Sequence, residues 1–195
     1  MTNSKRIRKI TTISILAAIL SILAFLPVRV SALEITLTVI PIAVGIILYG
    51  MEAGIILGSL FGVISFLQCL GYSPFGSMIL SINPWLTFLV CVPTRILVGV
   101  VPSIVHKLLL NKNKMLAQIM VCVLVPVLNT FFFMTMLCVG FYNSDVIQGF
   151  VDALNAANPF MFVILFVGVN GLVEMLCGIF VSYPVSKALE IVSNK

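Results

Sequence analysis

Charged residues are scarce in this 195-residue sequence: they make up 9% of it, whereas hydrophobic residues make up 61%. A soluble domain carries about 25% charged residues, so the composition excludes an ordinary soluble fold. The few charges gather in short clusters, and long apolar runs separate them. A run of about 20 apolar residues is long enough to cross the hydrocarbon core of a bilayer. The composition therefore predicts an all-α membrane protein.

Several catalytic and metal-binding patterns are also missing. The sequence contains no GxxxxGK[ST] phosphate loop and no HExxH motif, which argues against ATP hydrolysis through a P-loop and against zinc-protease chemistry. Its one histidine, His106, stands beside Lys107 at the edge of an apolar run and cannot serve a Ser/His dyad at membrane depth. The five cysteines form no CxxC pair, so we expect buried small hydrophobic residues rather than a metal site. We predict no enzyme activity, no cofactor and no metal.

Six apolar segments are separated by short connections. We predict one integral-membrane domain over residues 1–195, in which six transmembrane helices form a single bundle. The predicted spans are 8–27, 34–49, 53–70, 84–106, 115–140 and 159–187. Lys and Arg gather before the first span, after the fourth and in the tail. Because cytoplasmic loops carry an excess of these residues, both termini are predicted to be cytoplasmic.

The net charge of +5 follows from these clusters. It does not indicate a nucleic-acid partner, because no basic helix is interleaved with aromatic residues. The basic residues stand where anionic lipid headgroups would meet them. The partner expected from charge alone is therefore the bilayer.

The first span carries a stripe of small residues on an otherwise Ile/Leu-rich surface. Its members recur at spacings of three and four, which places them on one side of a helix: Ser14, Ala17, Ala18 and Ser21. Small residues let another helix approach closely. Two interpretations stay open, namely packing inside the bundle and a docking surface for a different membrane subunit.

The third span opens with four glycines, each four residues after the last: Gly50, Gly54, Gly58 and Gly62. Overlapping GxxxG units are typical of tightly packed membrane helices. We predict that this ladder packs internally, at a short distance from a neighbouring helix.

Two ionisable residues, Arg95 and Glu174, stand near the middle of the fourth and sixth spans. A charge at membrane depth is costly, so each indicates a functional site. Their depths match, so they could neutralise one another, and contact of Arg95 with an anionic ligand is compatible with that pairing. Neutral polar residues near this depth, and towards the outer surface, complete the predicted substrate-binding set: Asn83, Trp85, Asn129, Thr130 and Asn170. The pattern predicts an outward-opening pocket with apolar walls and a few directional groups.

Five segments, taken in order, carry a family resemblance: Ile35–Gly45, Asn83-Pro84, Pro93–Gly99, Leu128–Thr130 and Val169–Glu174. Together with the glycine ladder, they resemble the substrate-binding S components of energy-coupling factor (ECF) vitamin transporters. The resemblance implies a bacterial plasma-membrane protein that captures a water-soluble vitamin at high affinity from outside. It also implies a transmembrane coupling subunit and two cytoplasmic ATPase subunits as partners, with small residues of the first helix facing the coupling subunit. The loop at 27–33 is a lid candidate by the same resemblance.

The identity of the vitamin is less sharply indicated. Pantothenate, with a carboxylate, an amide and hydroxyls, would suit Arg95 and the amide side chains, and we favour it slightly. Riboflavin comes next, because Trp85 with the phenylalanines at 131–133 could line an aromatic slot. The alternatives to a vitamin-capture subunit are a stand-alone small membrane transporter or channel and a membrane-embedded enzyme.

Overall fold

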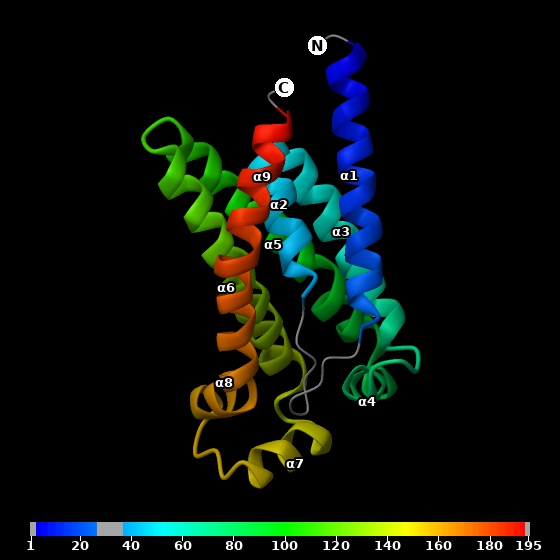
Figure 1. Cartoon of the computed structure of the whole chain (residues 1–195). Helices are drawn as coiled ribbons and strands as arrows, with labels where there is room; N and C mark the ends of the chain where they lie inside the picture. Colours follow the sequence, from blue (N-terminus) through cyan, green and yellow to red (C-terminus); the bar gives the residue numbers. More distant parts are fainter. Residues whose placement is uncertain (1–2, 27–36, 194–195) are drawn as a thin grey trace.

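The computed structural model describes residues 3–26 and 37–193, and these residues form a bundle of helices (Figure 1). The elements are α1 (Asn3–Ala24), α2 (Val39–Tyr49), α3 (Met51–Gln68), α4 (Pro74–Ile82), α5 (Pro84–Leu110), α6 (Lys114–Phe141), α7 (Asp145–Ala153), α8 (Pro159–Cys177), the π-helical turn η1 (Gly178–Ser182) and α9 (Tyr183–Ser193). Both ends of the chain lie at one end of the bundle, and α4 and α7 lie at the other (Figure 1). Within the described residues, five segments are long and apolar enough to span a membrane: Ser4–Ala24, Met51–Gln68, Pro84–Leu110, Lys114–Phe141 and Gly171–Glu190.

Helix starts follow local signals in the sequence. The side chain of Asn83 accepts hydrogen bonds from the backbone N–H groups of Trp85 and Leu86, both at 3.1 Å, and Pro84 occupies the first helical turn of α5. Asn158 caps α8 in the same way, directly before Pro159. Such caps satisfy N–H groups that have no partner inside the helix. The predicted helix starts at residues 84 and 159 are therefore confirmed.

The second predicted span was too long. Residues 34–36 lie outside the described part, and α2 begins at Val39 and has 11 residues. At 1.5 Å per residue it is roughly 16 Å long, about half the thickness of the hydrocarbon core. Eight of its residues are buried, so α2 serves as a central packing helix. The apolar run that predicted a span instead reflects burial inside protein.

Two helices were missed, because short segments between the apolar runs were taken as connections. The segment predicted to link the third and fourth spans contains α4, which buries Phe75 and Ile79. The segment after the fifth span contains α7, which buries Ile147 and Val151. A serine directly before each helix caps it, Ser73 for α4 and Ser144 for α7. Each is amphipathic and covers one end of the bundle.

The glycine ladder packs α3 directly against the backbone of α5. A β-carbon on Gly54 would lie 2.5 Å from the carbonyl oxygen of Gly99, and one on Gly58 would lie 2.6 Å from that of Arg95. At Gly62 the nearest atom would be the α-carbon of Val92, at 2.9 Å. These distances leave no room for any side chain, so the predicted internal packing is confirmed for three positions. We call this contact the glycine seam.

Gly50 has a different role from the rest of the ladder. It lies between α2 and α3 with φ of 67°, and a β-carbon there would meet no atom within 4 Å. Left-handed backbone of this kind favours glycine for conformational reasons alone. The residue therefore forms the tight turn of the α2–α3 hairpin, while the other three form the seam.

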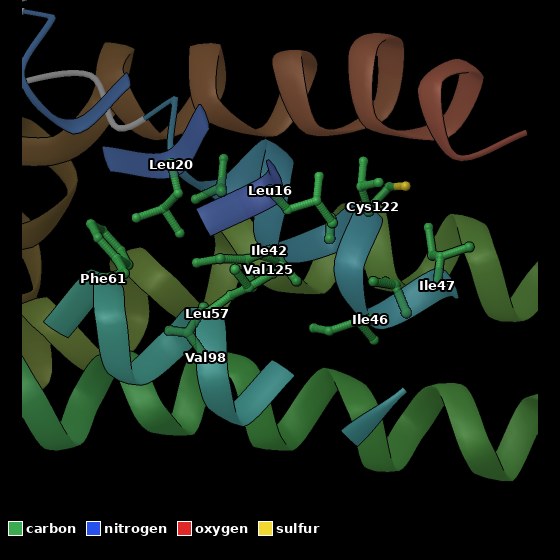
Figure 2. Close-up of a cluster of buried hydrophobic side chains, with 14 of the residues drawn as sticks. Leu16, Leu20, Ile42, Ile46, Ile47, Leu57, Phe61, Val98, Cys122 and Val125 are labelled. Atoms are coloured by element: carbon green, nitrogen blue, oxygen red, sulfur yellow. The ribbon is translucent and has the colours of Figure 1, made fainter. Parts of the chain in front are cut away.

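Buried apolar side chains form two clusters. The first surrounds α2 and includes Leu20, Ile42, Ile46, Leu57 and Val98, drawn from four helices (Figure 2). The second lies towards α4 and α7 and is rich in aromatic rings, with Phe75, Phe141, Phe162 and Phe166 among its members. The candidate site lies where the walls of these two clusters meet.

Candidate functional site

A cavity of about 120 Å³ lies among α1, α3, α4, α5, α6 and α8. Its walls take Phe61 from the first cluster and Phe75, Ile79, Met134 and Val167 from the second. Polar side chains interrupt this apolar lining at a few points: Thr38, Ser65, Gln68, Ser73, Arg95, Asn129, Thr130 and Glu174. An apolar hollow with a few directional groups is the usual form of a small-molecule site.

Arg95 is held within this wall and is 6% exposed. Its Nη1 donates to the carbonyl oxygen of Val90 at 2.9 Å and to the hydroxyl of Thr94 at 3.0 Å. The guanidinium carbon lies 4.8 Å from the ring centre of Phe133 and 5.4 Å from that of Phe61. The two rings stabilise the positive charge through cation–π contacts. Nε of Arg95 is buried and has no hydrogen-bond partner.

Glu174 enters the cavity from α8 and is 4% exposed. Its Oε2 accepts a hydrogen bond of 3.3 Å from Nδ2 of Asn129 on α6. The Oδ1 atom of Asn129 is buried and has no partner. The amide therefore orients the carboxylate with one end and keeps an acceptor at the other.

Thr38, just before α2, supplies a third polar atom of this kind. The residue is 1% exposed, its Oγ1 has no hydrogen-bond partner, and it lines the cavity. A buried polar atom without a partner costs about 1–3 kcal/mol. A ligand with both donors and acceptors would recover this energy at Thr38, Arg95 and Asn129 together.

The predicted substrate-binding residues divide into three groups. Arg95, Asn129, Thr130 and Glu174 line the one cavity, from three different helices. Asn83 and Trp85 do not line it: the Asn83 side chain caps α5, and Trp85 is 67% exposed and stacks on Phe88. The backbone of Asn170 belongs to α8, but its side chain lies outside the described residues.

The aromatic slot proposed for riboflavin does not form from the residues predicted for it. Phe131 is 58% exposed, like Trp85 on the outside of the bundle, and only Phe133 of this set lines the cavity. Neighbouring residues of a helix point in different directions, so a run of adjacent phenylalanines cannot all face one ligand.

The predicted substrate-binding set contains no residue of α3. Phe61, Ser65 and Gln68 line the cavity, and their spacings of four and three place them on one helix face. That spacing, with two polar members in an apolar span, was the available signal. Gln68 also donates from Nε2 to the carbonyl oxygen of Ala24, at 2.6 Å, and so joins α3 to the end of α1. The lid candidate at 27–33 begins beyond that point and lies outside the described residues.

The small residues of α1 split between two environments. Ser14 and Ala18 are exposed, whereas Ala17 and Ser21 are half-buried. Ala17 packs against the first cluster, and the Ser21 hydroxyl donates to the Ala17 carbonyl at 2.9 Å. Packing inside the bundle is therefore confirmed for one edge of the stripe. The other edge is a smooth outward surface, and docking of another subunit there stays a prediction.

A family model described as the ECF transporter, substrate-specific component, matches residues 8–186. This chain belongs to that family. It is an S component, a transporter subunit rather than an enzyme, and its apolar helices agree with a multi-pass membrane protein. No curated protein sequence matches it.

A solved structure shows the same fold as this S component. ThiT from Listeria monocytogenes superposes with a TM-score of 0.66 over 97% of this chain and 98% of that one, at 19% sequence identity. The predicted all-helical membrane fold is thus confirmed, and the count of six spans stays a prediction. At this identity, the similarity describes the fold alone.

Proposed function

We propose that this S component captures a water-soluble vitamin in the cavity around Arg95, Asn129 and Glu174. One observation carries the proposal: in this member of the family, a cavity with apolar walls holds a buried cation, a buried carboxylate and polar atoms without partners. No such arrangement is needed for packing, because buried polar groups without partners destabilise a fold. A bound ligand would supply the missing hydrogen-bond partners.

The proposal includes an orientation, with the whole chain as one membrane domain. Both termini and the α5–α6 connection lie at one end of the bundle (Figure 1). The basic residues of these segments support a cytoplasmic location for that end, in a bacterial plasma membrane. The cavity's α4 wall then lies towards the outside, from which a nutrient would enter.

Thiamine and pantothenate are the two candidate ligands that the lining supports. Thiamine carries an amino-pyrimidine and a cationic ring; Asn129 offers an amide to the pyrimidine, and the Glu174 carboxylate offers an acceptor and a negative charge. The fold shared with ThiT agrees with a vitamin-binding S component. Pantothenate is favoured by one observation, the unpartnered Nε of Arg95, which suits a carboxylate. The nearby Glu174 carboxylate disfavours such an anion, so we place thiamine first.

The cavity is smaller than a typical ligand site, which encloses about 300–1,000 Å³. A vitamin therefore enters only if a wall moves. The fold holds no motif for ATP hydrolysis, so we propose that release is driven by a transmembrane coupling subunit and two ATPases that dock on the exposed edge of α1. A stand-alone transporter or channel is the alternative.

The deciding experiment purifies the full chain and identifies co-purified small molecules by mass spectrometry. Calorimetric titration with thiamine, pantothenate and riboflavin then ranks the ligands. We expect thiamine to bind most tightly and Glu174→Gln to weaken it, with Glu52→Gln, an exposed acid outside the cavity, as the control. Absence of any vitamin binding, or active accumulation by the chain alone in liposomes, would contradict the proposal.

A further inference from the structure

A second cavity lies at the end of the bundle that holds the two termini. It encloses about 410 Å³ among α1, the α2–α3 turn and the last turns of α5. None of its lining residues lines the first cavity. An inference about this cavity therefore stands apart from the proposed vitamin site.

The polar wall of the second cavity is basic. Among the described residues, Lys9, His106 and Lys107 line it, and no acidic residue does. Glu52, outside the lining, forms an ion pair with Lys9, and Glu190 is held by Lys114 at 2.7 Å. The pair with Glu52 balances the charge of Lys9, so the positive charge of the lining comes from Lys107.

His106 supplies a specific polar group in this wall. The residue is only 6% exposed, and its Nε2 is buried without a hydrogen-bond partner. A buried ring nitrogen of this kind is costly to leave unsatisfied. In its N–H form it would donate to an oxygen acceptor such as phosphate.

The opposite wall is apolar. Ile47, Leu48, Met51 and Leu110 line it, and Met51 and Leu110 are also exposed on the outside of the bundle. A site that joins basic groups to lipid-exposed apolar side chains matches an amphipathic ligand. Basic pockets between membrane helices on the cytoplasmic side are known to take anionic lipid headgroups.

We infer that this cavity binds one anionic phospholipid. Its phosphate accepts hydrogen bonds from His106 and Lys107, and the start of its acyl chains packs against Leu48, on the membrane side of the α2–α3 turn. Free phosphate shares the headgroup chemistry but cannot use the apolar wall. Comparing lipid with phosphate alone therefore distinguishes the two sources.

Native mass spectrometry of the full chain, released from nanodiscs of equal phosphatidylglycerol and phosphatidylcholine, tests the inference. We expect one retained phosphatidylglycerol per chain. Lys107→Gln removes the lysine that contacts the lipid headgroup and should lower phosphatidylglycerol retention about fivefold. Lys112→Gln is the matched control: it removes a lysine from the same end, outside the cavity lining, and retention stays unchanged.

His106→Phe tests the histidine separately, because it keeps an aromatic ring while removing the nitrogen. Retention of phosphatidylglycerol should fall, while the titration of the vitamin cavity stays as in the unmodified chain. Equal retention of the two lipids, or full retention by both variants, would overturn the inference. So would glycerol 3-phosphate displacing the retained lipid at matched concentration, since the apolar wall would then contribute nothing.

Discussion

The glycine seam and the vitamin cavity share one stretch of α5, and they are built by opposite means. At Gly58 the absence of a side chain brings α3 against the carbonyl of Arg95. On the cavity side, the Arg95 side chain leaves space in front of Asn129 and Glu174. The seam has no room for a side chain, whereas the cavity keeps buried polar atoms without hydrogen-bond partners. Close packing thus fixes the backbone of a residue whose side chain remains available.

The largest effect is expected at the seam. A β-carbon at Gly99 would overlap the backbone of Gly54, so Gly99→Ala should destabilise the fold by about 3 kcal/mol. Gly149→Ala in α7 is the control, because nothing lies within 4 Å of its added carbon. Thermal unfolding in detergent, followed by size-exclusion chromatography, makes the comparison. If both variants melt at the same temperature, the seam is not the rigid contact described.

The next effect is expected at the cavity. Glu174→Gln keeps the shape and a carbonyl acceptor for Asn129 but removes the charge, so the affinity for thiamine should fall about tenfold or more. The melting temperature of the empty protein should change little, in contrast with Gly99→Ala. Calorimetry together with thermal unfolding measures both. A large loss of stability would mean that Glu174 serves packing, and the contrast between the two regions would weaken.

A third prediction asks whether the smooth edge of α1 works like the seam, but towards a partner. Ala18→Leu should leave vitamin affinity unchanged, because Ala18 is exposed and outside the cavity, and should reduce uptake severalfold in cells that contain the coupling subunit and ATPases. Ile19→Leu, at the neighbouring exposed position, is the control. Unchanged uptake in Ala18→Leu cells would reject docking at this edge.

The smallest effect is expected at Trp85. Its ring is exposed and stacks on Phe88 at a centroid distance of 5.6 Å, away from the cavity lining. Trp85→Ala should therefore alter vitamin affinity less than twofold, within about 0.4 kcal/mol. Fluorescence cannot serve here, because Trp85 is the single tryptophan; calorimetry is used instead. A tenfold loss of vitamin affinity would mean that Trp85 contributes to the binding site.

The parts of the fold that the sequence predicted are those with strong local signals. Asn83 and Pro84 predict the start of α5, and the four-residue spacing of the glycines predicts the seam. The length of α2 was misjudged, because hydropathy does not distinguish burial in lipid from burial among other helices. The helices α4 and α7 were missed for the related reason that each is short and only half apolar.

For the site residues, the sequence predicted membrane depth better than the direction in which each side chain points. Arg95, Asn129, Thr130 and Glu174 were selected as polar residues of apolar spans, and they share a cavity. Trp85 was selected by chemistry alone, and the turn of α5 carries it outward. Thr38 was not selected, because its relation to the other helices depends on where α2 begins, which is a property of the tertiary fold.

The absence of side chains between α3 and α5 also limits how the molecule can change shape. Two backbones in direct contact cannot slide or rotate past one another without first separating, so these helices behave as a single plate. Since a vitamin needs more volume than the cavity holds, the expansion has to come from the facing side, where α6, α8 and the end of α1 meet the plate. The glycines thereby decide which half of the bundle stays still while a nutrient enters.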